Sequence, residues 1–303
     1  MKFLRTPDIC FSNLPEFEFA PTYCNVVAAD GTLLRLHYVD YGPQSGRTIV
    51  LLHGEPSWSF LYRFMIRQLS DAGFRILAPD LIGFGKSDKP VEMGDYSYTA
   101  HVNWMQRWLD HVEVSDAVLF CQDWGGLIGL RLVADNIDRF AAVMAGNTGL
   151  PIGKGTPPEA FLKWQKFSQV VPEFPTGNIL QGATVRDLSS EEIAAYDAPF
   201  PDERYKAGAR IFPALVPTRP DMDGVAENLE AWKILQQWTK PFVTAFSDQD
   251  PVTRGGEAVF QKLIPGAAGQ PHQILKGGGH FLQEDVHAEL SEMLISLASR
   301  LDG

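Results

Sequence analysis

Short, continuous apolar runs recur along the chain, as in strands that a parallel sheet buries on both faces. Patterns with helical spacing, such as Phe60–Ala72 and Ala100–Val112, stand between these runs. Residues Tyr23–Tyr41 predict two more strands that turn at Asp30-Gly31. The apolar runs are Thr48–His53, Phe74–Ala78, Ala117–Cys121, Ala141–Ala145, Pro241–Phe246 and Gln273–Lys276. The alternation predicts an α/β fold, with a mostly parallel central sheet flanked by helices.

The alternation of strands and helices is interrupted between residues 149 and 223. This stretch is rich in proline and aromatic side chains, and it contains helical patterns but no segment that predicts a strand. A structureless connection of that length is uncommon in a compact domain. We therefore expect a core domain of residues 1–148 and 224–303, with residues 149–223 inserted as a helical cap domain.

Composition and charge narrow the range of partners. The 303 residues are 45% hydrophobic, which supplies a sizeable core, and the formal net charge is -11. An acidic surface repels phosphate, so nucleic acid is not an expected partner. No stretch approaches the roughly 20 apolar residues that span a bilayer, and no secretory leader pattern is present, so we expect no membrane partner and a cytoplasmic location. The lack of an obvious apolar docking helix favours a monomer.

The sequence predicts neither a metal site nor a cofactor. The three cysteines are widely spaced and form no CxxC pair, so reduced thiols are the simplest interpretation. No HExxH motif is present, and the glycine clusters lack the spacing of a dinucleotide-binding fold. Residues 80–87 end in Gly-Lys-Ser like a phosphate-binding loop, but Asp80 stands where that loop needs its first glycine.

The central motif is residues 121–126, which read Cys-Gln-Asp-Trp-Gly-Gly. It follows a predicted strand and precedes a predicted helix, Leu127–Ala134, as in the nucleophile elbow of the α/β-hydrolase fold. Small residues flank the nucleophile because the turn is strained and the helix packs closely on the strand. Asp123 holds the nucleophile position, where an esterase has serine. The alternative is that Asp123 only caps the following helix.

A second loop, residues 53–56 (His-Gly-Glu-Pro), follows the strand that ends at Leu52. In this fold the corresponding loop supplies one N–H of the oxyanion hole, and the residue after the nucleophile supplies the other. These donors are the backbone N–H groups of Glu55 and Trp124. We expect His53 to be a core histidine and not the catalytic base.

The remaining members of a triad occur in the order that the fold requires, nucleophile, acid and histidine. Residues 247–251 (Ser-Asp-Gln-Asp-Pro) end one predicted strand, and residues 277–281 (Gly-Gly-Gly-His-Phe) end the last. His280 is the predicted base. Two acids compete for the third position, and Asp250 is preferred to Asp248 because it directly precedes a proline turn.

With these motifs the chain resembles the haloalkane dehalogenases, in particular the subfamily of the 1,2-dichloroethane enzyme. The resemblance runs nearly end to end and includes residues 5–8 (Arg-Thr-Pro-Asp), 11–14 (Phe-Ser-Asn-Leu), 53–58 (His-Gly-Glu-Pro-Ser-Trp), 122–126 and 198–202 (Ala-Pro-Phe-Pro-Asp). It implies that Asp123 is the nucleophile, Asp250 the acid and His280 the base. It also implies that Trp124 and Trp164 bind the halide, although the spacing after Trp164 is shifted by about one residue.

The resemblance therefore implies a hydrolase that turns a haloalkane and water into an alcohol, a halide ion and a proton. An epoxide hydrolase shares the fold and the Asp nucleophile, and would use cap tyrosines such as Tyr196 or Tyr205 as acids. A haloacid dehalogenase would need an arginine where Trp124 stands. A receptor that has lost catalysis is a third alternative, although every triad member is present.

Overall fold

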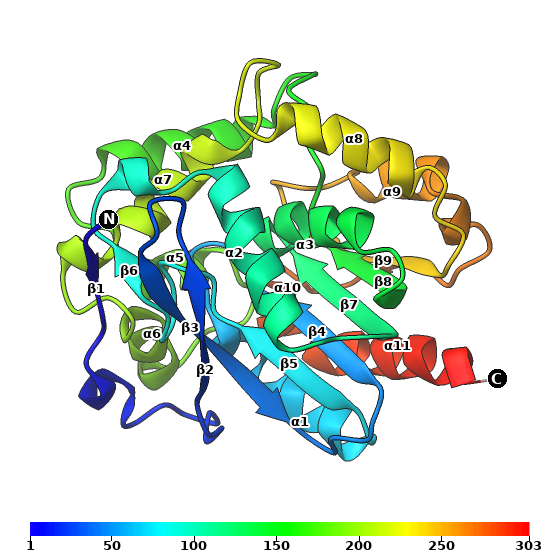
Figure 1. Cartoon of the computed structure of the whole chain (residues 1–303), viewed down its shortest axis with the longest axis horizontal. Helices are drawn as coiled ribbons and strands as arrows, with labels where there is room; N and C mark the ends of the chain where they lie inside the picture. The colour runs from blue at the N-terminus through cyan, green and yellow to red at the C-terminus, as the bar shows by residue number, and fades with distance from the viewer. Residues whose placement is uncertain (303) are drawn as a thin grey trace.

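The computed structural model describes residues 1–302, with one eight-stranded sheet at the centre (Figure 1). The strand order is β10-β9-β8-β7-β4-β5-β3-β2. Neighbours from β10 to β5 run parallel, while β3 and β2 are antiparallel to theirs. The strands are β2 (Thr22–Val27), β3 (Leu33–Tyr41), β4 (Thr48–Leu52), β5 (Arg75–Pro79), β7 (Ala117–Gln122), β8 (Phe140–Gly146), β9 (Phe242–Ser247) and β10 (Gln273–Leu275). The predicted α/β fold is confirmed.

Burial follows the position of each strand in the sheet. Every residue of β7, β8 and β9 is buried, as the continuous apolar runs predict for strands covered on both faces. The last strand differs from this expectation, because β10 lies at the edge and Ile274 is 51% exposed. A separate two-residue ribbon, β1 (Phe3–Leu4) with β6 (Lys89–Pro90), was not predicted, since pairs this short leave no pattern in the sequence.

Helices cover both faces of the sheet. Helix α1 (Arg63–Asp71) packs on α11 (His287–Ser299), and α2 (Tyr98–His111), α3 (Trp124–Asp135) and α8 (Val225–Leu235) form the other layer (Figure 1). Two shorter helices, α9 (Glu257–Leu263) and α10 (Leu282–Asp285), follow β9 and β10. Helix α2 begins two residues before the predicted start because the Ser97 side chain caps it by accepting from the Ala100 N–H. Within residues 1–302, no helix is both long and apolar enough to cross a membrane.

Four helices lie between β8 and α8 in the sequence, and we call them the helical insertion. They are α4 (Glu159–Val170), α5 (Thr176–Gly182), α6 (Ser190–Asp197) and α7 (Ala207–Leu215). Helix α4 packs on α7, and α5 packs on α6. A capping box between Ser189 and Glu192 starts α6. The predicted helical character of this stretch is present, and residues 149–223 contain no strand in the structure.

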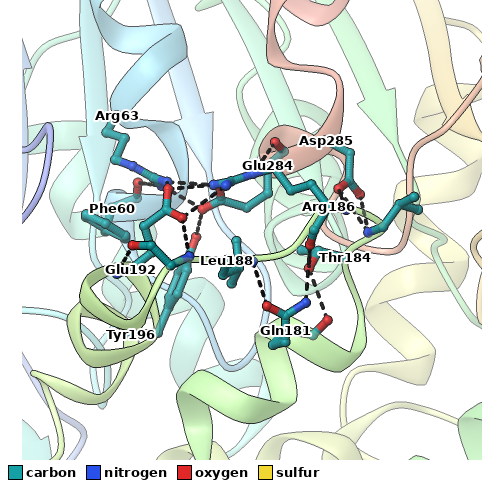
Figure 2. Close-up of polar contacts among 12 residues, drawn as sticks. Phe60, Arg63, Gln181, Thr184, Arg186, Leu188, Glu192, Tyr196, Glu284 and Asp285 are labelled. Carbon is teal, nitrogen blue, oxygen red and sulfur yellow. Dashed lines mark hydrogen bonds and ion pairs between the residues drawn. The ribbon is translucent and has the colours of Figure 1, made fainter.

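A buried ionic cluster joins the helical insertion to the core (Figure 2). We call it the Arg63–Glu284 cluster. The Arg63 guanidinium of α1 donates to Glu284 of α10 at 2.6 and 2.9 Å and to Glu192 of α6 at 2.6 Å. Arg186 binds the same two carboxylates, and the Tyr196 hydroxyl donates to Glu284. Removing one partner of such a buried set leaves an uncompensated charge, so the α5–α6 half of the helical insertion is tied firmly to the core.

Candidate active site

Asp123 lies at the turn between β7 and α3, with backbone angles of φ 51° and ψ -124°. This positive φ is costly for a residue other than glycine, and such strain is typical of a nucleophile elbow. The turn depends on small neighbours, because a Cβ on Gly125 would run into the carbonyl of Leu52. Although Asp123 stands at the N-cap position of α3, its side chain makes no capping hydrogen bond. The capping alternative is therefore not what the geometry favours.

The loop after β4 approaches the Asp123 carboxylate directly. The backbone N–H of Glu55 donates to Oδ1 of Asp123 at 2.8 Å. Only glycine fits at the preceding position, because a Cβ on Gly54 would lie 2.5 Å from the Cβ of Asp123. His53 is fully buried, and its Nε2 accepts from the Leu81 N–H at 3.0 Å. His53 therefore belongs to the core, as expected, while Glu55 faces the carboxylate.

His280 stands between the predicted nucleophile, Asp123, and one of the two candidate acids, Asp250. Its Nε2 lies 3.5 Å from Oδ2 of Asp123, and its Nδ1 lies 3.1 Å from Oδ2 of Asp250. The competing acid, Asp248, instead accepts from the backbone N–H of Gly277 at 2.9 Å. The geometry therefore brings Asp123, His280 and Asp250 into one chain of contacts and leaves Asp248 outside it.

The electrostatics of His280 follow from these contacts. Burial disfavours the charged imidazolium, but Asp250 and then Asp123 outweigh burial and raise the pKa of His280 to about 10. Burial also opposes ionisation of Asp250, yet His280 and hydrogen bonds from Thr253 and Val252 keep the pKa of Asp250 well below its ordinary value. At neutral pH, His280 is therefore protonated between two carboxylates.

A cavity of about 660 Å³ opens above Asp123. Asp123, His280, Glu55 and the two predicted halide-binding tryptophans, Trp124 and Trp164, all line it. Trp124 comes from the first residue of α3, and Trp164 comes from α4 in the helical insertion. An indole N–H only donates hydrogen bonds, so two tryptophans beside a carboxylate can stabilise a departing anion without competing with the nucleophile.

The Glu55 side chain is the unexpected group in this cavity. It is 4% exposed, and its Oε1 has no hydrogen-bond partner among residues 1–302. Burial raises the pKa of Glu55 well above its ordinary value, and the negative charge of Asp123 raises it further. His280 and the Trp164 indole act in the opposite direction. Burial and the neighbouring Asp123 therefore both favour the neutral form of the Glu55 carboxyl beside the nucleophile.

A second cavity of about 380 Å³ also reaches Asp123 and Trp124. Phe161, Val216 and Val252 line both cavities and so stand between them. No sequence motif predicted this second space, because residues from five separate parts of the chain line it.

Two buried amides position the triad and were not assigned a role from the sequence. The Gln122 side chain lies 3.3 Å from Nε2 of His280 and donates to the His280 carbonyl at 3.1 Å. Asn147 donates to Ser247 at 2.8 Å and to the carbonyls of Gly279 and His280 at 2.9 and 3.0 Å. Their locations at the ends of β7 and β8 are the only signal that could have indicated them.

The cap tyrosines required by the epoxide-hydrolase alternative do not reach the cavity. The hydroxyl of Tyr196 is buried against Glu284, and neither Tyr196 nor Tyr205 lines either cavity. Among the described residues, no group of three or more His, Cys, Asp or Glu side chains is arranged to hold a metal ion.

Comparison with known proteins first defines the class. Residues 47–285 match the alpha/beta hydrolase fold family. The curated relatives then define the branch. The haloalkane dehalogenase of Psychrobacter cryohalolentis is 55% identical over 97% of both chains, and that of Mycolicibacterium paratuberculosis is 50% identical over 98% of both chains. The chain belongs to the haloalkane dehalogenase family, whose members are hydrolases acting on carbon–halide bonds.

Solved structures agree with the sequence relatives. The haloalkane dehalogenase DpaA of Paraglaciecola agarilytica is 36% identical, with a TM-score of 0.88 over 96% of this chain and 97% of that one. The haloalkane dehalogenase DbeA of Bradyrhizobium elkani, at 21% identity and a TM-score of 0.80 over 93% of this chain and 98% of that one, supports the fold alone.

Proposed function

We propose that the chain hydrolyses haloalkanes through a covalent alkyl ester on Asp123. The observation that carries the proposal is the arrangement in the larger cavity. There a carboxylate at a nucleophile elbow faces two indole side chains and lies 3.5 Å from a histidine. A carboxylate is ionised at neutral pH and needs no base to activate it, and a halide leaves without a proton.

In the first step, an oxygen of Asp123 attacks the carbon that bears the halogen. The carbon–halogen bond breaks, and the halide departs with the electron pair. Trp124 supports the departing anion, because its indole N–H has no protein acceptor among residues 1–302. The Trp164 indole lies beside Glu55 and acts to lower the pKa of that carboxyl. A carboxyl held in its neutral form is a weaker acceptor than a halide ion. Trp164 is thus the second halide donor.

In the second step, water attacks the carboxyl carbon of the Asp123 ester while His280 accepts one of its protons. The tetrahedral intermediate then collapses as the bond between the carboxyl carbon and the alkoxy oxygen breaks. The alcohol leaves with the second proton of the water, and the Asp123 carboxylate is regenerated. This step needs a neutral imidazole, although His280 is protonated in the resting site. Ester formation supplies the change, because it removes the charge of Asp123 and thereby lowers the pKa of His280. The proton released at that point is the proton of the overall reaction. Asp250 orients the ring and stabilises its charged form.

The oxyanion of the second step forms on the Asp123 carboxyl. The Glu55 N–H, which already donates to Oδ1 at 2.8 Å, supports its role as one oxyanion donor. The backbone N–H of Trp124, at the start of α3, is the other. Such donors each contribute about 3–4 kcal/mol in related acyl-transfer chemistry.

The organisation around this site is part of the same proposal. Residues 149–223 form a cap domain on a core of residues 1–148 and 224–303, because the helical insertion supplies one wall of the larger cavity. The three unpaired cysteines support a reducing compartment such as the cytoplasm. We keep a monomer as the proposed state, and light scattering tests it, since the DpaA structure is described as tetrameric.

The decisive experiment follows bromide and alcohol formation from 1,2-dibromoethane and 1-bromobutane. The wild type is expected to release one bromide per alcohol formed. Asp123→Ala should release none, even within a single turnover, while retaining a native circular dichroism spectrum. A wild-type bromide burst in Asp123→Ala would refute the covalent mechanism. Diol formation from an epoxide, without bromide release, would favour the epoxide-hydrolase alternative.

A further inference from the structure

The candidate active site has two openings that differ in the charged groups around them. In the larger cavity the charge of the Asp123 carboxylate is offset by the neighbouring His280, and the described lining contains no lysine or arginine. The smaller cavity is lined by no carboxylate other than Asp123, and it carries Lys154 and Arg254. Both cations are exposed, so they lie toward its solvent end.

The charges of these two cations are not cancelled by carboxylates. Within residues 1–302, neither Lys154 nor Arg254 takes part in an ion pair. Arg254 is held in place by a neutral acceptor instead, because its Nη2 donates to the Asp248 carbonyl at 2.6 Å. In a chain with a formal net charge of -11, two unpaired cations at one cavity make a local positive potential that opposes the overall sign.

The proposed reaction creates a need for such a potential. It takes in a neutral haloalkane and produces an anion at the bottom of a largely apolar pocket. Moving an unpaired anion through a medium of low dielectric constant is costly, and fixed cations along the way reduce that cost. The cations do not stabilise a neutral haloalkane. We therefore expect the incoming haloalkane and the outgoing halide to use different routes.

Trp124 connects the two spaces at the point where the anion forms. Its ring lines both cavities, and it is one of the proposed halide donors. A halide bound there is already at the inner end of the smaller cavity. The larger cavity has no lysine or arginine in its described lining that could stabilise an outgoing anion.

From this arrangement we infer that the smaller cavity is the exit route for halide, running from Trp124 to Lys154 and Arg254, while the haloalkane enters through the larger cavity. The inference rests on the proposed function, because it assigns the departing halide of that reaction. It makes Lys154 and Arg254 residues that act on product release and not on the chemical step.

The first test blocks each opening separately. Thr156→Trp places a large ring at an exposed position that lines only the smaller cavity, and Val185→Trp does the same for the larger one. Stopped-flow tryptophan fluorescence gives the bromide dissociation rate, and rapid quench gives the rate of ester formation from 1-bromobutane. Thr156→Trp is expected to slow bromide release by about ten-fold or more without changing ester formation. Val185→Trp should do the reverse.

The second test reverses the charge at the two cations of the smaller cavity without blocking that cavity. Lys154→Glu with Arg254→Glu is expected to lower the bromide association rate by about ten-fold or more at low ionic strength, with the difference disappearing at about 1 M salt. The matched control is Lys163→Glu with Lys166→Glu, which makes the same charge change at exposed positions of α4 that line neither cavity. The control should retain more than half of the wild-type rate.

Bromide binding to the resting protein needs no catalysis, so these results are separable from the proposed function. If the wild type binds bromide but forms no ester, the proposed function fails, and the route is still measured. If Val185→Trp slows bromide release and Thr156→Trp does not, halide leaves through the larger cavity and the inference is overturned. Equal rates for the two charge-reversed pairs would overturn it as well.

Discussion

The core and the helical insertion hold their functional side chains by different means. In the core, Asp123 accepts from a backbone N–H, and His280 is bracketed by two carboxylates and the amides that bind its carbonyl. In the helical insertion, Trp164 is half-buried and packs on Phe167 and Phe174. The reacting groups and Trp124 thus lie on the core, and the second proposed leaving-group donor, Trp164, lies on a layer with fewer constraints.

Substitution of His280 gives the largest expected effect and tests the core side of this comparison. His280→Phe should abolish turnover, because no base remains for the ester, yet ester formation should continue. Mass spectrometry should then find a stable alkyl adduct on the peptide that contains Asp123. A folded His280→Phe protein that gives neither an adduct nor bromide would contradict the division of labour between Asp123 and His280.

The next prediction compares two acids in one loop. Asp250→Asn should lower the rate of ester hydrolysis by about 10⁴-fold, as removing the orienting carboxylate does in serine hydrolases. Asp248→Asn should lower it by less than about ten-fold, because the Asp248 side chain accepts from the Gly277 backbone and makes no contact with His280. Single-turnover hydrolysis of the trapped ester measures both variants, and the reverse ranking would move the acid to Asp248.

The helical-insertion side of the comparison should show a smaller effect. Trp164→Phe keeps most of the ring and removes the donor. A hydrogen bond to a charged group contributes about 1.5–3 kcal/mol, so carbon–halogen cleavage should slow by roughly ten- to a hundred-fold. Bromide should also quench the remaining fluorescence less strongly. The matched control is Trp238→Phe, whose buried indole lines neither cavity and has no hydrogen-bond partner among the described residues. If the rate of carbon–halogen cleavage is unchanged in Trp164→Phe, Trp164 contributes only to packing.

The smallest effect concerns the titration of His280. Its pKa is raised from 6.5 to about 10, so its contribution to folding stability is complete below pH 6.5 and is lost as the pH rises through about 10. Asp123→Asn mimics the uncharged ester and should lower the pKa of His280, as nuclear magnetic resonance of its imidazole nitrogens can measure. The protein mass verifies that the amide persists. A pKa of His280 equal to that of the wild type would contradict the proposal that ester formation on Asp123 lowers this pKa.

Much of this architecture was available from the sequence, for physical reasons that particular residues illustrate. Continuous apolar runs revealed β7 and β8, because burial on both faces excludes polar alternation. The elbow was visible because Asp123 must be followed by residues as small as Gly125 and Gly126 to let α3 approach the sheet. Local patterns of this kind carry their own steric explanation.

The remainder depends on contacts between residues far apart in the chain. The raised pKa of Glu55 comes from burial beside Asp123, and the role of Asn147 comes from carbonyls more than 130 positions away. Ile274 is exposed because β10 forms the edge of the sheet. None of these features leaves a periodic or motif-like trace, so they appeared only once the chain was folded.

The Arg63–Glu284 cluster limits how this molecule could be recombined with its relatives. Glu284 binds the helical insertion through Arg186 and Tyr196, while the adjacent Asp285 accepts from the N–H of Gly279, the residue before the histidine. A segment exchange that moved residues 149–223 alone would separate the guanidinium of Arg186 from the carboxylate that it neutralises. Successful chimeras should therefore transplant α1 and α10 with the helical insertion, because Arg63 of α1 binds both Glu284 and Glu192. The segments that must be exchanged together are separate in the sequence although they are contiguous in space.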